Sequence, residues 1–179
     1  ASGFAANVWT NNAWITVQAV VFGVTGFWPV VMLLQNGLNI GLSAGVMGAH
    51  GGLGTFFVYI LPHGLLEITS VLVGAGAGLR TFWAWVRPGQ LPRLWALSHA
   101  ARALVTVAIG LVPVLLVAGV VEAFVTPSSL PPAVRIGIGA AVGLAAVVFM
   151  PGRGRQVHRE GVTGDLSEEL VGARVATAG

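Results

Sequence analysis

The first 66 residues contain no Asp, Glu, Lys or Arg, and long apolar stretches continue to about residue 150. The chain of 179 residues is 55% hydrophobic and only 8% charged, and its mean hydropathy is +0.85. Soluble domains carry about 25% charged residues, and a folded domain of this size still exposes a large part of its surface. The composition therefore excludes an ordinary soluble domain and a disordered chain, and it predicts an integral membrane protein.

The charged residues divide the chain into two parts. Residues 1–150 hold seven charged side chains, whereas the last 29 residues hold eight. We therefore predict a transmembrane helical domain over residues 1–150 and a flexible cytoplasmic tail over residues 151–179. The net charge of +3 comes from Arg residues next to the membrane, so it does not indicate a nucleic-acid partner. The absence of cysteine excludes disulfides, thiolate metal sites and cysteine nucleophiles.

Five apolar stretches predict an all-α, polytopic bundle with about five transmembrane helices. They cover residues 12–34, 35–49, 53–79, 103–125 and 133–150. A span needs roughly 20 residues, so the second stretch either crosses fully or forms a re-entrant hairpin. A single helix over residues 12–49 would be roughly 55 Å long, which is too long for one crossing. We therefore expect a break near Gln35-Asn36-Gly37.

The distribution of arginine sets the expected orientation, because cytoplasmic loops are enriched in positive charge. Two groups of arginines mark the cytoplasmic side: Arg80, Arg87, Arg93 and Arg102, and then Arg153, Arg155 and Arg159. The uncharged loops 50–52 and 126–132 should lie outside. The N-terminus of this chain is then outside and the C-terminus inside. An external N-terminus without a signal peptide leads us to expect that an earlier span is missing from this chain.

The connection between the third and fourth stretches has two features. Trp83 and Trp85, close to Arg80, fit an aromatic belt at the membrane interface. Residues 86–101 contain two prolines and a glycine followed by an amphipathic stretch. This segment is either a simple connector or a docking surface for a cytoplasmic partner.

Glycine makes up 26 of the 179 residues, about twice the usual share. Small residues spaced by four allow the backbones of membrane helices to approach closely. We predict helix packing at Gly37, Gly41, Gly45, Gly74 and Gly78, and the spacing repeats at Gly139 and Gly143. The contacts lie either within one chain or between copies in a homo-oligomer. A gated pore lined by small residues is the alternative.

The most informative polar segment runs from Pro62 to Glu67. Pro62 removes a backbone donor and disfavours helix at the preceding residue, and Gly64 adds local freedom. We therefore predict a helix break at Pro62-His63-Gly64. His63 and Glu67 are four residues apart, so on a helix they share one face. That face should point into protein rather than toward lipid.

Polar side chains at membrane depth are costly and usually pair, neutralise or serve a function. The predicted intramembrane network comprises Asn11, Asn12, Asn36, His63, Glu67, Arg80 and Glu122. This network either fixes the fold or, through His63 and Glu67, carries protons or an ion. A metal centre needs three or four ligands and this pair offers two. We therefore predict no metal, no cofactor and no catalytic residue, and the chain shows no nucleophile elbow, phosphate loop or paired carboxylates.

Several of these segments together resemble the stage II sporulation protein M family. They are WTNNAW (9–14), QNGLNIG (35–41), ILPHGLLEITSVLVGAGAGLR (60–80), RPG (87–89) and VVEAFVTPSSLP (120–131). Their order and spacing match across about residues 8–150. The family's motif positions fall here on Asn11, Asn12, Asn36, Gly37, Pro62, His63, Gly64, Glu67, Arg80, Glu122 and Pro127. Members usually have an N-terminal cytoplasmic region and a preceding span, and we expect both to be missing from this chain.

The resemblance implies a polytopic protein of the bacterial inner membrane. The founding member is similar to a scaffold that holds cell-wall hydrolases at the septal membrane during sporulation. We therefore expect a non-enzymatic scaffold or assembly factor for cell-envelope complexes, with the lipid bilayer and other envelope or membrane proteins as partners. The alternative is a small-solute or proton-coupled transporter, or a channel, that uses His63 and Glu67.

Overall fold

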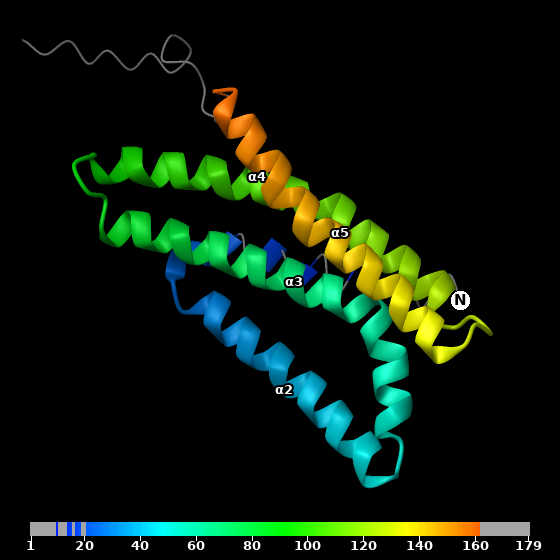
Figure 1. The fold of residues 1–179 in the computed structure, drawn as a ribbon. Helices are drawn as coiled ribbons and strands as arrows, with labels where there is room; N and C mark the ends of the chain where they lie inside the picture. Colours follow the sequence, from blue (N-terminus) through cyan, green and yellow to red (C-terminus); the bar gives the residue numbers. More distant parts are fainter. Residues whose placement is uncertain (1–9, 11–13, 16, 19–20, 162–179) are drawn as a thin grey trace, which may run out of the picture.

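The computed structural model describes residues 10, 14–15, 17–18 and 21–161, and these residues are helical or lie in turns, with no strand among them. The all-α prediction is confirmed for this part of the chain. Figure 1 shows the order of the elements. They are η1 (Gly23–Thr25), α2 (Trp28–Ala49), α3 (Leu53–Val86), α4 (Arg93–Val120), η2 (Val121–Val125) and α5 (Pro132–Arg159).

Four helices in the described part of the chain are long and apolar enough to cross a membrane. They are Trp28–Ala49, Leu53–Val86, Arg93–Val125 and Pro132–Gln156. The structure thus describes four spans where about five were predicted: the second to fifth predicted stretches fall within these helices, whereas only residues 28–34 of the first stretch, 12–34, belong to one of them. Residues 12, 13, 16, 19 and 20 of that first stretch lie outside the described residues. The expected boundary at residue 150 falls inside α5, which continues through Pro151 to Arg159.

The predicted division at Gln35-Asn36-Gly37 is wrong, because α2 runs through these residues without interruption. The Asn36 amide donates to the Met32 carbonyl oxygen of the preceding turn at 3.0 Å. This polar side chain is thus satisfied inside the helix instead of ending it. Residues 35–49 form the second part of one 22-residue helix and not a re-entrant hairpin. At about 1.5 Å per residue such a helix is long enough to cross the hydrocarbon core.

The chain turns before α2 at Gly26, nine residues earlier than predicted. Gly26 has a φ of +74°, which glycine adopts without steric cost. The Trp28 amide donates to the Thr25 hydroxyl at 3.2 Å, and Pro29 stands in the first turn of the helix, where its missing N–H costs nothing. Glycine followed shortly by proline was the sequence signal for this boundary.

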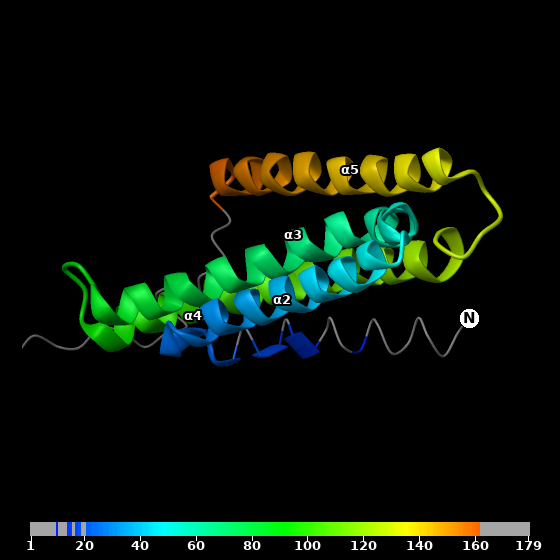
Figure 2. The same cartoon turned by 90° about the horizontal axis from the view of Figure 1, so that it is seen from below.

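Helix α3 is the centre of the bundle. Helices α2, α4 and α5 each pack against it, as does η1. Figure 2 shows α3 between α5 on one side and α2 and α4 on the other. Its buried residues Ser70, Gly74 and Gly78 follow one another at four-residue spacing, so this face points into the protein.

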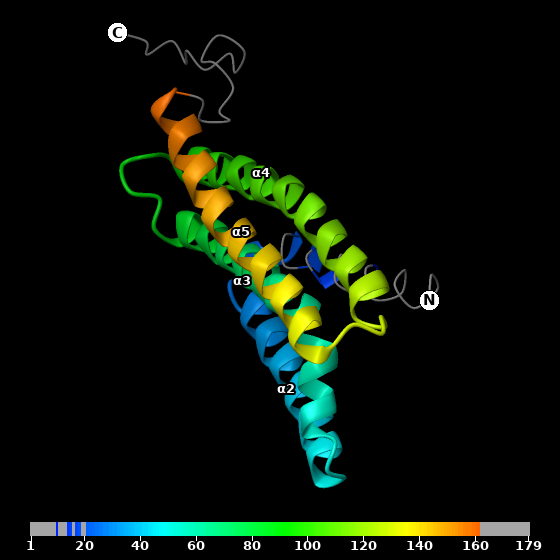
Figure 3. The same cartoon turned by 45° about the vertical axis from the view of Figure 1, so that its right-hand side comes forward.

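The predicted break at Pro62-His63-Gly64 is a bend within a continuous helix. All 34 residues of α3 are helical, with Pro62 inside. Figures 1 and 3 show the first turns of α3 directed away from the rest of the helix. Proline removes one backbone hydrogen bond and clashes with the preceding turn, so it kinks a helix. The bend carries the α2–α3 connection beyond the α4–α5 connection (Figure 3).

Candidate functional site

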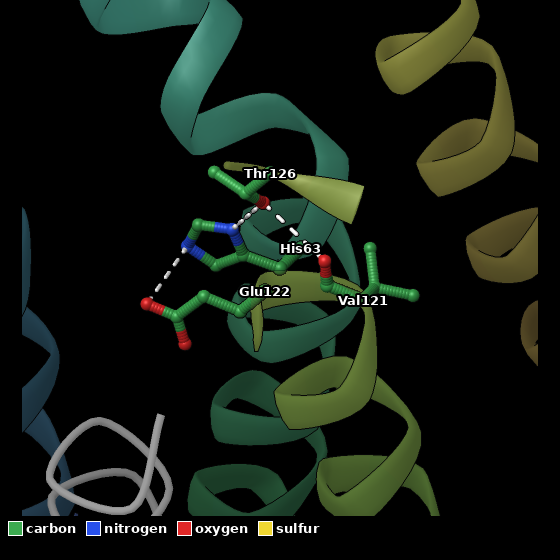
Figure 4. Close-up of polar contacts among 4 residues, drawn as sticks. All are labelled: His63, Val121, Glu122 and Thr126. Carbon is green, nitrogen blue, oxygen red and sulfur yellow. Dashed lines mark hydrogen bonds and ion pairs between the residues drawn. The ribbon is translucent and has the colours of Figure 1, made fainter. Parts of the chain in front are cut away.

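The bend in α3 places His63 against the last turn of the fourth-helix segment. The Nδ1 atom of His63 lies 3.3 Å from the Thr126 hydroxyl oxygen, and its Nε2 atom lies 4.0 Å from Oε1 of Glu122. Figure 4 shows the imidazole ring between these two side chains. The His63 side chain is 12% exposed and the Glu122 side chain 4%. The contact is therefore a buried one between residues 59 positions apart in sequence.

A π-helical turn positions both partners of His63. Residues Val121–Val125 form η2, and the Thr126 amide donates to the Val121 carbonyl five residues earlier at 3.0 Å. Single π turns inside α-helices recur at functional sites. Here the wider turn presents Glu122 and Thr126, four residues apart, to the same imidazole ring (Figure 4). No signal in the sequence marked this turn.

The two ring nitrogens of His63 face different partners. The Thr126 hydroxyl donates weakly to the Val121 carbonyl at 3.5 Å, so it accepts from Nδ1–H of the ring. The Nε2 atom then faces Oε1 of Glu122. The 4.0 Å separation is longer than a direct hydrogen bond. The contact is therefore at the limit of ion-pair distance and is not a direct hydrogen bond.

Arg135 of α5 contacts both Thr126 of this cluster and the ring of Tyr59. Its Nη1 atom donates to the Thr126 carbonyl at 2.7 Å, and its guanidinium carbon lies 5.7 Å from the centre of the Tyr59 ring. Arg135 thereby links α5 to the end of η2 and to the first part of α3. Sequence reasoning missed Thr126, Arg135 and Tyr59. The signal available was Arg135 itself, a charged residue inside an apolar stretch.

Two polar atoms of the cluster are buried without a hydrogen-bond partner. They are Oε2 of Glu122 and Nε of Arg135. Buried polar groups are normally paired, so each exception calls for an explanation. The cluster is thus only partly satisfied by the contacts described.

A groove of about 450 Å³ between α2 and α3 reaches the same histidine. Its lining is mostly apolar, and its polar members are Asn36, His63 and Glu67. His63 and Glu67 thus share a face, as the four-residue spacing predicted. The ring of His63, however, is turned toward Glu122 and Thr126 (Figure 4), a contact that the spacing did not indicate.

The remaining predicted residues separate into three groups. Asn36, His63, Glu67 and Glu122 lie around the bend in α3, and Asn11 and Asn12 lie outside the described residues. Arg80 does not join them: it is exposed beside Trp83 in the second half of α3. Eighteen residues of helix separate Arg80 from the bend, so it does not contact the other predicted members of the network. Among the described residues no three His, Cys, Asp or Glu side chains gather as a metal site would require.

The glycines predicted to pack helices fall into two classes. A side chain at Gly139 would overlap the Pro62 backbone, and one at Gly23 would lie 2.5 Å from the Gly78 Cα atom. Gly74 and Gly78 are buried. At Gly37, Gly41 and Gly45, by contrast, an added Cβ atom meets nothing within 4 Å. No described residue fills the space in front of the second group, and Gly37 of this group lines the groove between α2 and α3.

Four apolar spans around a buried polar cluster define an all-α, multi-pass membrane protein in a lipid bilayer. The chain matches the stage II sporulation protein M family over residues 1–127. That match covers most of the 179 residues, and the chain belongs to this family. No curated protein and no solved structure matches the chain.

Proposed function

We propose that this protein is a non-enzymatic scaffold or assembly factor that holds cell-envelope proteins together in the bacterial inner membrane. The observation that carries the proposal is an exposed face of α2 that no described residue of this chain covers. In the most apolar part of α2 only 6% of residues are buried, against 28% in α3. Gly37, Gly41 and Gly45 lie on this helix with open space in front of them.

The chemistry of this face suits a partner helix. Lipid tails are as apolar as leucine, so membrane helices associate by close packing rather than by a hydrophobic drive. Three glycines at four-residue spacing let a second backbone approach closely. Family membership supports the same reading, because the resemblance implies a scaffold for envelope enzymes.

The test is purification of the full-length protein from its own membranes in mild detergent, with mass spectrometry of the proteins that co-elute. We expect a stoichiometric envelope protein with the unmodified chain. Gly41→Leu should reduce its recovery severalfold. Gly110→Leu is the matched control, since Gly110 of α4 is equally open and exposed. A clean homo-oligomer without partners, or equal recovery with both variants, would contradict the scaffold.

A second candidate function is supported by the groove at the bend. Asn36, His63 and Glu67 line it, and Nε2 of His63 lies 4.0 Å from Oε1 of Glu122. Bent helices with polar residues near the middle of the membrane are a recurrent feature of transporters. We infer a proton-coupled transporter as the alternative. Glu67→Gln should then abolish flux in proteoliposomes while the protein still folds, whereas a scaffold should keep its partners with this variant.

A further inference from the structure

The end of α3 farthest from the bend carries a cationic and aromatic surface that the proposed function does not use. Figure 1 places the α3–α4 connection at the opposite end of the molecule from the α4–α5 connection. The exposed residues Arg80, Trp83 and Trp85 lie there on α3, and the exposed Arg87 directly follows its last residue, Val86. We refer to Gly76, Arg80, Trp83 and Arg87 as the α3 stripe. Gly76, Arg80 and Trp83 share one face of α3, because they are four and three residues apart. Arg87, the residue that follows α3, lies over the Trp83 ring.

The α3 stripe borders a shallow groove of about 570 Å³. Its lining residues are Gly76, Leu79, Arg80, Phe82 and Trp83. Gly76 has open space where a Cβ atom would stand, so the groove stays open on the side toward the bilayer centre. Phe82 is held by the turn before α2, because a side chain at Gly26 would lie 2.7 Å from its ring. The groove therefore has a fixed aromatic wall and an apolar floor.

The positive charge at this end of α3 has no acidic partner among the described residues. The carboxylates described are Glu67 and Glu122, which lie around the bend, and Glu160, which accepts from the Gln156 amide at the end of α5. The Arg87 guanidinium lies 5.8 Å from the centre of the Trp83 ring. Stacking on an aromatic face holds a guanidinium in place and leaves its N–H edges free.

We propose that the α3 stripe binds an anionic glycerophospholipid, with Arg80 and Arg87 on the phosphate groups and one acyl chain in the groove over Gly76. Arg80 lies about 10 Å deeper than Arg87 along the helix axis, and a long arginine side chain extends toward the interface from such a depth. Guanidinium groups bind phosphate oxygens in a bidentate manner. A phospholipid supplies both parts of the complementarity, negative charge at the interface and an apolar chain below it. The groove and the charge together therefore favour a whole lipid over a free anion.

The test measures lipid binding to the purified full-length chain by native mass spectrometry. The probes are phosphatidylglycerol and phosphatidylcholine with identical acyl chains. We expect phosphatidylglycerol to bind at least fivefold more tightly. The double variant Arg80→Gln/Arg87→Gln should remove this preference, whereas Arg153→Gln, a matched change of an exposed arginine in α5, should keep it. Equal binding of the two lipids, or an unchanged preference in the double variant, would overturn the proposal.

A second variant separates the acyl groove from the headgroup contacts. Gly76→Leu fills the groove without removing charge, so phosphatidylglycerol should bind at least threefold more weakly. Gly110→Leu is again the control and should bind normally. Glycerol phosphate, which is the headgroup chemistry alone, should fail to displace the lipid at millimolar concentration. Displacement by glycerol phosphate, or full binding by Gly76→Leu, would show an anion site without a lipid groove and would overturn the proposal.

Discussion

Gly137 and Gly139 stand two residues apart in α5, but only one of them has a neighbour. Gly139 is buried against the Pro62 backbone, and a Cβ atom there would overlap it. Gly137 is exposed and meets nothing within 4 Å. The close approach of α5 to the bend in α3 therefore depends on the absence of one side chain.

This difference predicts opposite effects for two identical substitutions. Gly139→Ala should lower the free energy of unfolding by about 1–3 kcal/mol, because the added methyl group overpacks the contact with Pro62. Gly137→Ala should leave stability unchanged or raise it by up to about 1 kcal/mol, since alanine favours helix. Thermal unfolding in detergent measures both variants. Equal unfolding temperatures for the two proteins would show that α5 does not rest on Pro62.

The hydrogen bond between the Thr126 hydroxyl and His63 can be tested with single substitutions. Thr126→Val removes the hydrogen bond to His63 Nδ1 and should cost about 0.5–1.5 kcal/mol. Thr106→Val is the matched control, because that hydroxyl bonds only to the Arg102 carbonyl of its own helix. In a His63→Leu background Thr126→Val should cost nothing further. An unchanged cost in that background would mean that the two side chains are not coupled.

At the scale of the element, the bend in α3 determines which parts of the chain lie against its first half. Pro62 is fully buried, and the bend turns His63 toward η2 while it directs the α2–α3 connection past the α4–α5 connection (Figure 3). A straight helix of the same sequence would keep His63 and Glu67 on one face but would change their neighbours.

Restoring a regular helix should therefore move the α2–α3 connection. Pro62→Ala replaces the missing backbone donor, and a kink of more than about 20° acting over nine residues predicts a displacement of roughly 4 Å or more. The chain has no cysteine, so spin labels at Ala49→Cys and Ser129→Cys report the distance cleanly. A distance distribution that is the same with proline and with alanine would show that Pro62 does not set the bend.

At the scale of the whole molecule, every other span packs against α3. The four spans alternate in direction, so the α2–α3 and α4–α5 connections emerge on one side of the membrane and the α3–α4 connection on the other. The arginines near the α3–α4 connection predict that this side is cytoplasmic.

Labelling of single cysteines with a membrane-impermeant maleimide tests this arrangement. Ala49→Cys and Ser129→Cys should react in intact cells. Gln90→Cys, in the α3–α4 connection, should react only after the membrane is permeabilised. If all three positions reacted alike, the alternating arrangement would be wrong, and if the pattern were reversed, the predicted orientation would be wrong.

Some features of this protein followed from the sequence alone. The apolar stretches determined an all-α membrane protein, because a bilayer leaves an apolar chain no other backbone structure that satisfies its hydrogen bonds except a closed barrel. Pro62 marked the bend, and the four-residue spacing correctly placed His63 and Glu67 on one face. These are local properties, set by the backbone and by helical periodicity.

The tertiary structure decided the rest, because periodicity fixes the face of a helix and not its neighbour. Glu122 and Thr126 reach His63 only through the packing of α3 against the π turn of η2. Gly139 and Gly78 contact other parts of the chain, whereas Gly41 meets no described residue, although all three belong to repeats with the same four-residue spacing. The tertiary structure also decided where the chain turns before α2. Gln35-Asn36-Gly37 remains helical because the Asn36 amide bonds within its own helix. The chain turns at Gly26 instead.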